Sequence, residues 1–207
     1  FIGALSAFRS YQANLVSVPL NADGMDIDAL KKLLELDGPK PKFLYYSPNF
    51  HNPAGIIYSK EVKQQMIELL NGKDIPIIED DVYSDLYFYE DDVPKMELIK
   101  SMNPEGIDVC FTGSFSKILG PGLRLGWMLV PDHIYNKCEL IKQSIDACSP
   151  SISQVIADKF IRDGHIHKYI ASIRTEYKKR GLAMIEALDE YLPEGVIYEK
   201  PRGGFYT

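Results

Sequence analysis

Short apolar segments alternate with longer amphipathic segments along most of this 207-residue chain. Residues 26–36 and 59–70 repeat apolar side chains every three or four positions, which is the spacing of one helical face. Strands that alternate with such helices form parallel βαβ units, with helices on both faces of the sheet. We therefore predict an α/β fold with a mostly parallel sheet, whose strands cover residues 14–20, 42–46, 75–78 and 109–112.

One further strand departs from this parallel arrangement. The apolar run from residue 125 to residue 130 follows the strand at 109–112 after a short connection. A parallel crossover needs a dozen or more residues, so we expect this run to lie antiparallel beside its predecessor. Lys117 and Arg124 would then face each other at one end of the sheet.

Polar side chains gather at or just past the carboxyl ends of three expected strands. Ligands bind at this edge of an open parallel sheet, so these positions favour one shared site. Taken singly, each residue has an ordinary structural role, such as a turn at Asn-Pro or a helix cap at an acid. Together they supply an amide, a carboxylate, a phenol, an amine and an anion site, from Asn52, Asp80, Tyr83, Ser114, Ser116, Lys117 and Arg124.

The sequence after residue 130 predicts helices. The first covers residues 132–148 and is broken at Ser149-Pro150, before a second helix that Ser151 is expected to cap. The third helix, residues 164–191, would be about 40 Å long at 1.5 Å per residue. A helix of that length often connects two domains.

We therefore expect two domains. Residues 1–163 would form a large ligand-binding domain that lacks its N-terminal part. Residues 164–207 would hold the connecting helix and the beginning of a smaller α+β domain, with strands at residues 196–198 and 204–206. Because the chain starts without a methionine and stops inside the last segment, we expect it to be part of a longer protein.

Composition excludes several classes of function. The net charge of −6 gives no basic surface for nucleic acid or an anionic membrane. No apolar run approaches the roughly 20 residues that span a bilayer. Three cysteines without CxxC spacing indicate a reducing, cytoplasmic location and no structural zinc, and the scattered histidines do not form a metal site.

Five motifs together resemble a known family, the fold-type I pyridoxal-phosphate enzymes, and specifically class I/II aminotransferases of the aminoadipate and aromatic type. The resemblance covers all 207 residues, and the combination is specific although each motif alone is weak. The motifs are Asn52-Pro53-Ala54-Gly55, Glu79-Asp80-Asp81-Val82-Tyr83, Ser114-Phe115-Ser116-Lys117, Pro121-Gly122-Leu123-Arg124-Leu125-Gly126 and Arg202-Gly203-Gly204-Phe205.

This resemblance implies a role for each polar residue near the ring of the cofactor, pyridoxal 5′-phosphate. Lys117 matches the lysine that forms the Schiff base and then moves a proton as acid and base. Asp80 matches the carboxylate partner of the pyridine nitrogen. Tyr83 and Asn52 match the residues that hydrogen-bond the phenolate oxygen, and Phe1 falls where the family places an aromatic side chain that stacks on the ring.

The family pattern also implies partners and missing parts. Ser114, Ser116 and Arg124 match the phosphate cradle, where a guanidinium suits a dianion better than an ammonium does. Amino acids and 2-oxo acids would be the substrates, and a homodimer would be the active form. The small phosphate loop and the arginine that binds the substrate carboxylate would lie outside residues 1–207, and Asn52-Pro53 is a candidate cis peptide bond.

Three functions remain open on these residues. The first is a pyridoxal-phosphate-dependent aminotransferase. The second is the effector-sensing domain of a GntR-type winged-helix transcription regulator, which resembles the same family and would bind nucleic acid only through an upstream winged-helix domain. The third is another reaction of the same cofactor, such as β-elimination, for which no residue is distinctive.

Overall fold

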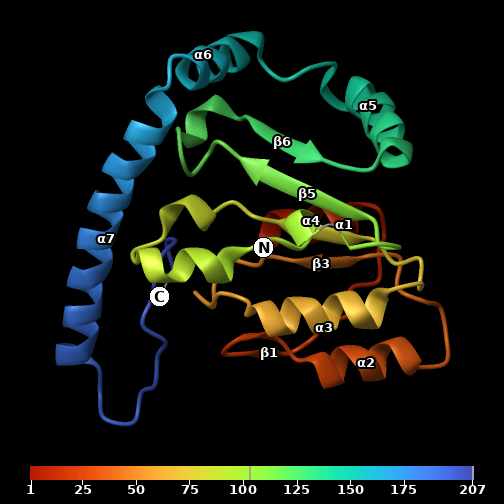
Figure 1. Cartoon of the computed structure of the whole chain (residues 1–207), viewed down its shortest axis with the longest axis horizontal. Helices are drawn as coiled ribbons and strands as arrows, with labels where there is room; N and C mark the ends of the chain where they lie inside the picture. Colours follow the sequence, from red (N-terminus) through yellow and green to blue (C-terminus); the bar gives the residue numbers. More distant parts are fainter. Residues whose placement is uncertain (103, 207) are drawn as a thin grey trace.

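A computed structural model of the chain describes residues 1–102 and 104–206. Its centre is a four-stranded sheet with the order β3-β4-β5-β6 (Figure 1). The first three strands are parallel, and β6 returns antiparallel to β5, as the sequence predicted. The bounds are Leu44–Tyr46 for β3, Ile77–Asp80 for β4, Val109–Ser114 for β5 and Gly126–Leu129 for β6.

The strands β4 and β5 end later than the sequence pattern indicated. We expected β4 at residues 75–78, but it begins after Pro76, which has no backbone N–H to donate to a ladder, and runs to Asp80. We expected β5 to stop at Thr112, but it runs to Ser114. Two of the candidate site residues are therefore the last residues of strands and share the rigidity of the sheet.

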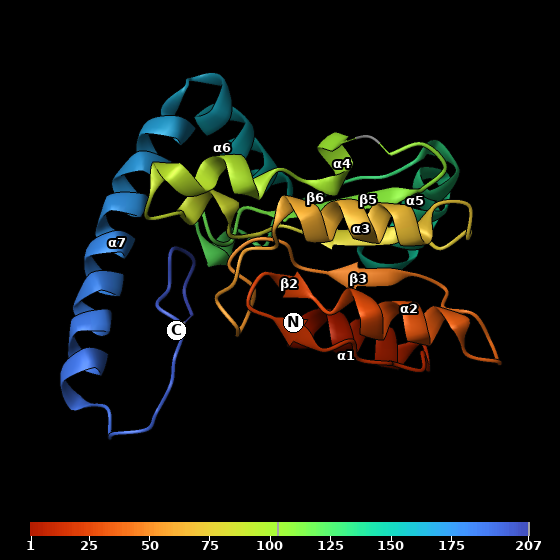
Figure 2. The same cartoon turned by 60° about the horizontal axis from the view of Figure 1, so that its bottom comes forward.

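Helices cover both faces of the sheet at its parallel end. Tyr46, Ile77 and Val109 point to one face and pack in a core with side chains of α2 (Ile27–Glu35) and α3 (Lys60–Leu70). On the other face, Phe8 of α1 (Ile2–Ser10) packs on Phe43 and Tyr45, with ring centroids 4.9 and 5.6 Å apart. Figure 2 shows α1 and α3 on opposite sides of β3. The helix α1 has no counterpart among the predicted elements.

The predicted helix caps at α2 and α3 are present. Asp26 Oδ1 accepts a hydrogen bond from the Ala29 N–H at 2.9 Å, and Ser59 Oγ accepts one from the Val62 N–H at 3.1 Å. Each cap satisfies a backbone donor that the first helical turn leaves without a partner. The predicted cap at Ser151 is wrong, because Ser151 is the first residue of α6 (Ser151–Arg162) and its side chain caps nothing.

The C-terminal part begins with α5 (Asp132–Asp146) and leads through α6 to the 27-residue α7 (His165–Tyr191), which stands at one end of the sheet (Figure 1). Arg174 connects α7 to the segment that follows β4. Its Nε donates to the Asp85 carbonyl oxygen at 3.0 Å, and its guanidinium carbon lies 3.6 Å from the Tyr87 ring centroid. Short helices lie between β4 and β5: η1 (Ser84–Leu86), η2 (Glu90–Met96) and α4 (Ile99–Met102). None of the described helices combines the length and the apolar sequence needed to cross a bilayer.

Two groups of predicted strands are wrong. Of residues 14–20 only Leu20 is paired, in the short ribbon of β1 (Leu20–Asn21) and β2 (Gly24–Met25), because Pro19 cannot donate to a ladder. Residues 196–198 and 204–206 form no strand. Instead the chain before Tyr206 returns to the segment that follows β4, where the Phe88 N–H donates to the Arg202 carbonyl oxygen at 2.8 Å.

The two serines at helix starts provide a test of the fold. We expect Ser59→Ala to lower the free energy of unfolding by about 1 kcal/mol, because the Val62 N–H loses its acceptor. Ser151→Ala is the matched control and should leave the unfolding curve unchanged. Urea denaturation of both variants measures the difference, and equal losses would contradict the assigned cap.

Candidate functional site

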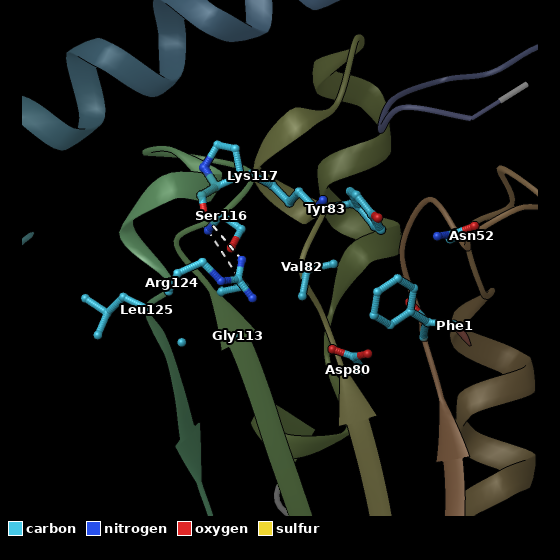
Figure 3. Close-up of a pocket in the computed structure, with 14 residues that line it drawn as sticks. Phe1, Asn52, Asp80, Val82, Tyr83, Gly113, Ser116, Lys117, Arg124 and Leu125 are labelled. Atoms are coloured by element: carbon cyan, nitrogen blue, oxygen red, sulfur yellow. Dashed lines mark hydrogen bonds between the residues drawn. The ribbon is translucent and has the colours of Figure 1, made fainter. Parts of the chain in front are cut away.

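A cavity of about 410 Å³ opens at the carboxyl ends of β4 and β5. Figure 3 shows Asp80 at the tip of its strand, with Phe1 and Asn52 on one side and Lys117, Ser116 and Arg124 on the other. All eight residues predicted for the site line this one cavity: Phe1, Asn52, Asp80, Tyr83, Ser114, Ser116, Lys117 and Arg124. The remaining lining residues are Ser47, Val82, Gly113, Pro121, Leu125 and Gly126.

Asp80 is held by hydroxyl groups from both neighbouring strands. The Tyr45 hydroxyl of β3 donates to Asp80 Oδ2 at 2.6 Å, and the Thr112 hydroxyl of β5 donates to Oδ1 at 3.1 Å. Neither donor was among the residues predicted for the site. Thr112 could have been found, since it is the register partner of Asp80 in the parallel pair, whereas Tyr45 reaches Asp80 on a diagonal.

The acids on either side of Asp80 serve other parts of the structure. Glu79 is fully buried on the opposite face, where it accepts from the Tyr46 hydroxyl and from the backbone N–H groups of Ile99 and Lys100 at 2.7 and 2.9 Å. Asp81 is buried as well, and this burial raises the pKa of its carboxyl to about 6. Successive side chains of a strand alternate between its faces. Of these three acids, only Asp80 lines the cavity.

Lys117 lies in the tight connection that leaves β5. The Ser116 N–H donates to Ser114 Oγ at 3.1 Å, and the Phe115 N–H donates to the Leu125 carbonyl oxygen at 3.1 Å, so this turn is fixed from both sides. The Lys117 Nζ is 5.9 Å from the centroid of the Tyr83 ring. A cation at this distance from an aromatic face is attracted to the ring.

Arg124 reaches the same cavity from the start of β6. Its backbone is left-handed, with φ 50° and ψ 44°, a conformation that few non-glycine residues adopt. Such a conformation persists where the surrounding structure fixes it, and it is frequent at ligand sites. The guanidinium donates to the Pro121 carbonyl oxygen at 3.2 Å and keeps further N–H donors for an anion.

Tyr83 is buried beside the end of the described chain. Its ring lies 5.7 Å from the Phe205 ring and 5.9 Å from the Tyr206 ring, both in edge-on geometry. Burial raises the pKa of the Tyr83 phenol, the Tyr206 hydroxyl raises it further, and the Asn52 amide lowers it. The phenol is therefore protonated at neutral pH. The peptide bond between Asn52 and Pro53 is cis, as the sequence motif suggested.

The sequence model of the family "Aminotransferase class I and II" matches residues 4–207. This chain belongs to the class I and II aminotransferase family. The predicted α/β fold of the family is confirmed, because solved aminotransferases match 99% of this chain in structure.

Two solved aminotransferases illustrate this structural likeness. A kynurenine aminotransferase of Pyrococcus horikoshii has a TM-score of 0.91 at 39% identity, covering 99% of this chain and 50% of its own. The α-aminoadipate aminotransferase LysN of Thermus thermophilus has a TM-score of 0.88 at 32% identity, covering 99% of this chain and 51% of its own.

The sequence relatives of this chain include enzymes and regulators. An aromatic-amino-acid aminotransferase of Thermococcus litoralis is 39% identical over all of this chain and 49% of its own length. An uncharacterized HTH-type transcriptional regulator of Bacillus subtilis, YdfD, is 32% identical over all of this chain and 42% of its own length. The chain thus spans about half the length of the curated relatives it matches.

Gly203 lies where the surrounding atoms leave no room for a side chain. A Cβ at Gly203 would lie 2.5 Å from Phe50 Cε1 and 2.8 Å from the Leu86 carbonyl oxygen. We expect Gly203→Ala to lower the free energy of unfolding by about 1–3 kcal/mol, the usual cost of overpacking, and to loosen the segment that places Phe205 beside Tyr83. Gly122→Ala, where a Cβ meets nothing within 4 Å, is the control. Equal stability of the two variants in thermal unfolding would contradict this packing.

Proposed function

We propose that the protein containing this chain is a pyridoxal-phosphate-dependent aminotransferase that moves an amino group from an amino acid to a 2-oxo acid. The observation that carries the proposal is the single cavity that Lys117 and Asp80 share. It joins an amine and an anchored carboxylate to a cluster of hydroxyl and guanidinium donors. Because the polar groups of a pocket fix the orientation of its ligand, these three kinds of group match a ligand with three chemically different ends.

The donor set fits pyridoxal phosphate end by end. Lys117 would hold the aldehyde carbon, and Asp80 would hold the pyridine nitrogen. Tyr83 and Asn52 would hydrogen-bond the ring oxygen, and Phe1 would pack on the ring. The phosphate would bind at Ser114, Ser116 and Arg124. When bound, the cofactor supplies electron withdrawal from the α-carbon of the substrate, which is the difficult part of amino-group transfer.

The side chains of the chain would divide the remaining work. The Lys117 amine, once free of the cofactor, would hold and release the proton that leaves the substrate α-carbon. Asp80, fixed by two hydroxyl donors, would place a negative charge against the ring nitrogen. Arg124 would anchor the phosphate with forked donors. Tyr83, kept protonated by burial, would donate its hydroxyl hydrogen to the ring oxygen.

The same proposal extends to the whole protein. Residues 1–163 would be most of the cofactor-binding domain, and residues 164–207 would connect it to a second, smaller domain. A cytoplasmic homodimer would be the active form. The relatives named for aromatic amino acids and 2-aminoadipate favour an amino-acid donor with a large side chain.

A second candidate is an amino-acid sensor within a transcription regulator, which the likeness to the regulator of Bacillus subtilis supports. Catalytic turnover separates the two functions. With 2-oxoglutarate and a panel of amino acids, an aminotransferase should release glutamate through many turnovers per protein molecule. A protein that binds the cofactor and amino acids but forms no more than one glutamate per site would contradict the enzymatic proposal.

Asp80 provides a sharper prediction. Asp80→Asn should keep cofactor binding, because the phosphate and Lys117 contacts remain, but should lose at least about 100-fold in kcat, since an uncharged amide stabilises a protonated ring nitrogen poorly. The control is Asp81→Asn, which changes an adjacent acid outside the cavity. Steady-state kinetics measure both, and an unchanged kcat in Asp80→Asn would show that Asp80 does not hold the ring nitrogen.

A further inference from the structure

The two hydroxyl groups that anchor Asp80 belong to residues that do not line the cavity themselves. A carboxylate accepts at about four lone-pair positions over its two oxygens. Tyr45 takes one position on Oδ2 and Thr112 takes one on Oδ1, so each oxygen keeps one position for another donor. The two hydroxyls come from the strands on either side of β4, so the carboxyl group is held in orientation from both edges.

We propose that Tyr45 and Thr112 are positioning residues that hold the Asp80 carboxylate in one orientation, in which its charge lies against the ring nitrogen of the cofactor and stabilises the protonated form of that nitrogen. This inference rests on the proposed function. Loss of either hydroxyl leaves the carboxylate less fixed, so its charge stabilises the protonated ring nitrogen less and the ring loses that proton more readily.

The surroundings of Tyr45 suit this role. Burial, and then the charge and hydrogen bond of Asp80, raise the pKa of the Tyr45 phenol, so the phenol remains a donor at neutral pH. The Phe8 ring packs edge-on against the Tyr45 ring with centroids 5.6 Å apart. Helix α1 therefore holds the phenol in place, and the hydroxyl points to Asp80 with little rotational freedom to lose.

The opposite face of the sheet provides a matched control. Tyr46, the next residue of β3, donates its hydroxyl to Glu79, the residue before Asp80 in β4. This pair is also a phenol that donates to a carboxylate between β3 and β4. Glu79, however, accepts from backbone N–H groups at α4 as well and does not line the cavity. Tyr46→Phe removes an equivalent phenol–carboxylate bond at a place where only stability should respond.

The experiment loads the full-length protein with pyridoxal phosphate isotopically labelled at the ring nitrogen and records the nitrogen NMR shift, which reports protonation of that atom. We expect Tyr45→Phe and Thr112→Val each to move the signal towards the unprotonated ring and to lower kcat roughly tenfold, the equivalent of losing one hydrogen bond to a charged group. The KM for the amino acid should stay within about twofold, because neither substitution removes a contact that binds the substrate. Thr112→Ser retains the hydroxyl and should restore the parent signal.

The outcomes separate the inference from the function on which it rests. A parent-like nitrogen shift in folded, cofactor-loaded Tyr45→Phe and Thr112→Val would overturn the positioning role while leaving the proposed function intact. A signal in Tyr46→Phe that moves as far as in Tyr45→Phe would also overturn it, since the effect would then be general destabilisation of the sheet. A parent protein that takes up no pyridoxal phosphate would overturn both.

Discussion

The register between β4 and β5 is the constraint on which the site depends. It pairs Asp80 with Thr112 in neighbouring parallel strands, and the antiparallel return pairs Ser114 with Gly126. Adjacent strands lie about 4.8 Å apart, so three successive strands place a carboxylate, a lysine turn and an arginine within the width of one small molecule. A slip of one residue in either pairing would turn Asp80 or Ser114 to the other face.

The charged side chains of the sheet and its covering helix lie on two different faces, one buried against α3 and one open to the cavity. Glu79 and Lys63 are both fully buried on the side of α3, where backbone groups satisfy them. Burial lowers the pKa of Lys63 to about 8 although nearby acids oppose the shift. On the other side, Asp80 keeps free lone pairs and Lys117 faces the cavity, which are the conditions that a polar ligand requires.

The sequence predicted much of the fold because its local signals agreed with the tertiary structure. Capping residues, helical spacing and the short connection after β5 gave α2, α3 and the antiparallel β6. The cavity followed from one rule, that ligands bind at the carboxyl ends of parallel strands. Two of the failures were non-local. The strand expected at residues 204–206 is a segment held against Phe50 and Leu86, and the donor Tyr45 depends on the tilt between strands, which no local pattern records.

The central claim is that the amine of Lys117 carries the cofactor at the same cavity that presents Asp80. Borohydride treatment of the protein loaded with pyridoxal phosphate, followed by proteolysis and mass spectrometry, tests it most directly. We expect the phosphopyridoxyl group on Lys117, and we expect Lys117→Ala to acquire no stable label. A label on another lysine, with the Lys117 peptide unmodified, would contradict the account.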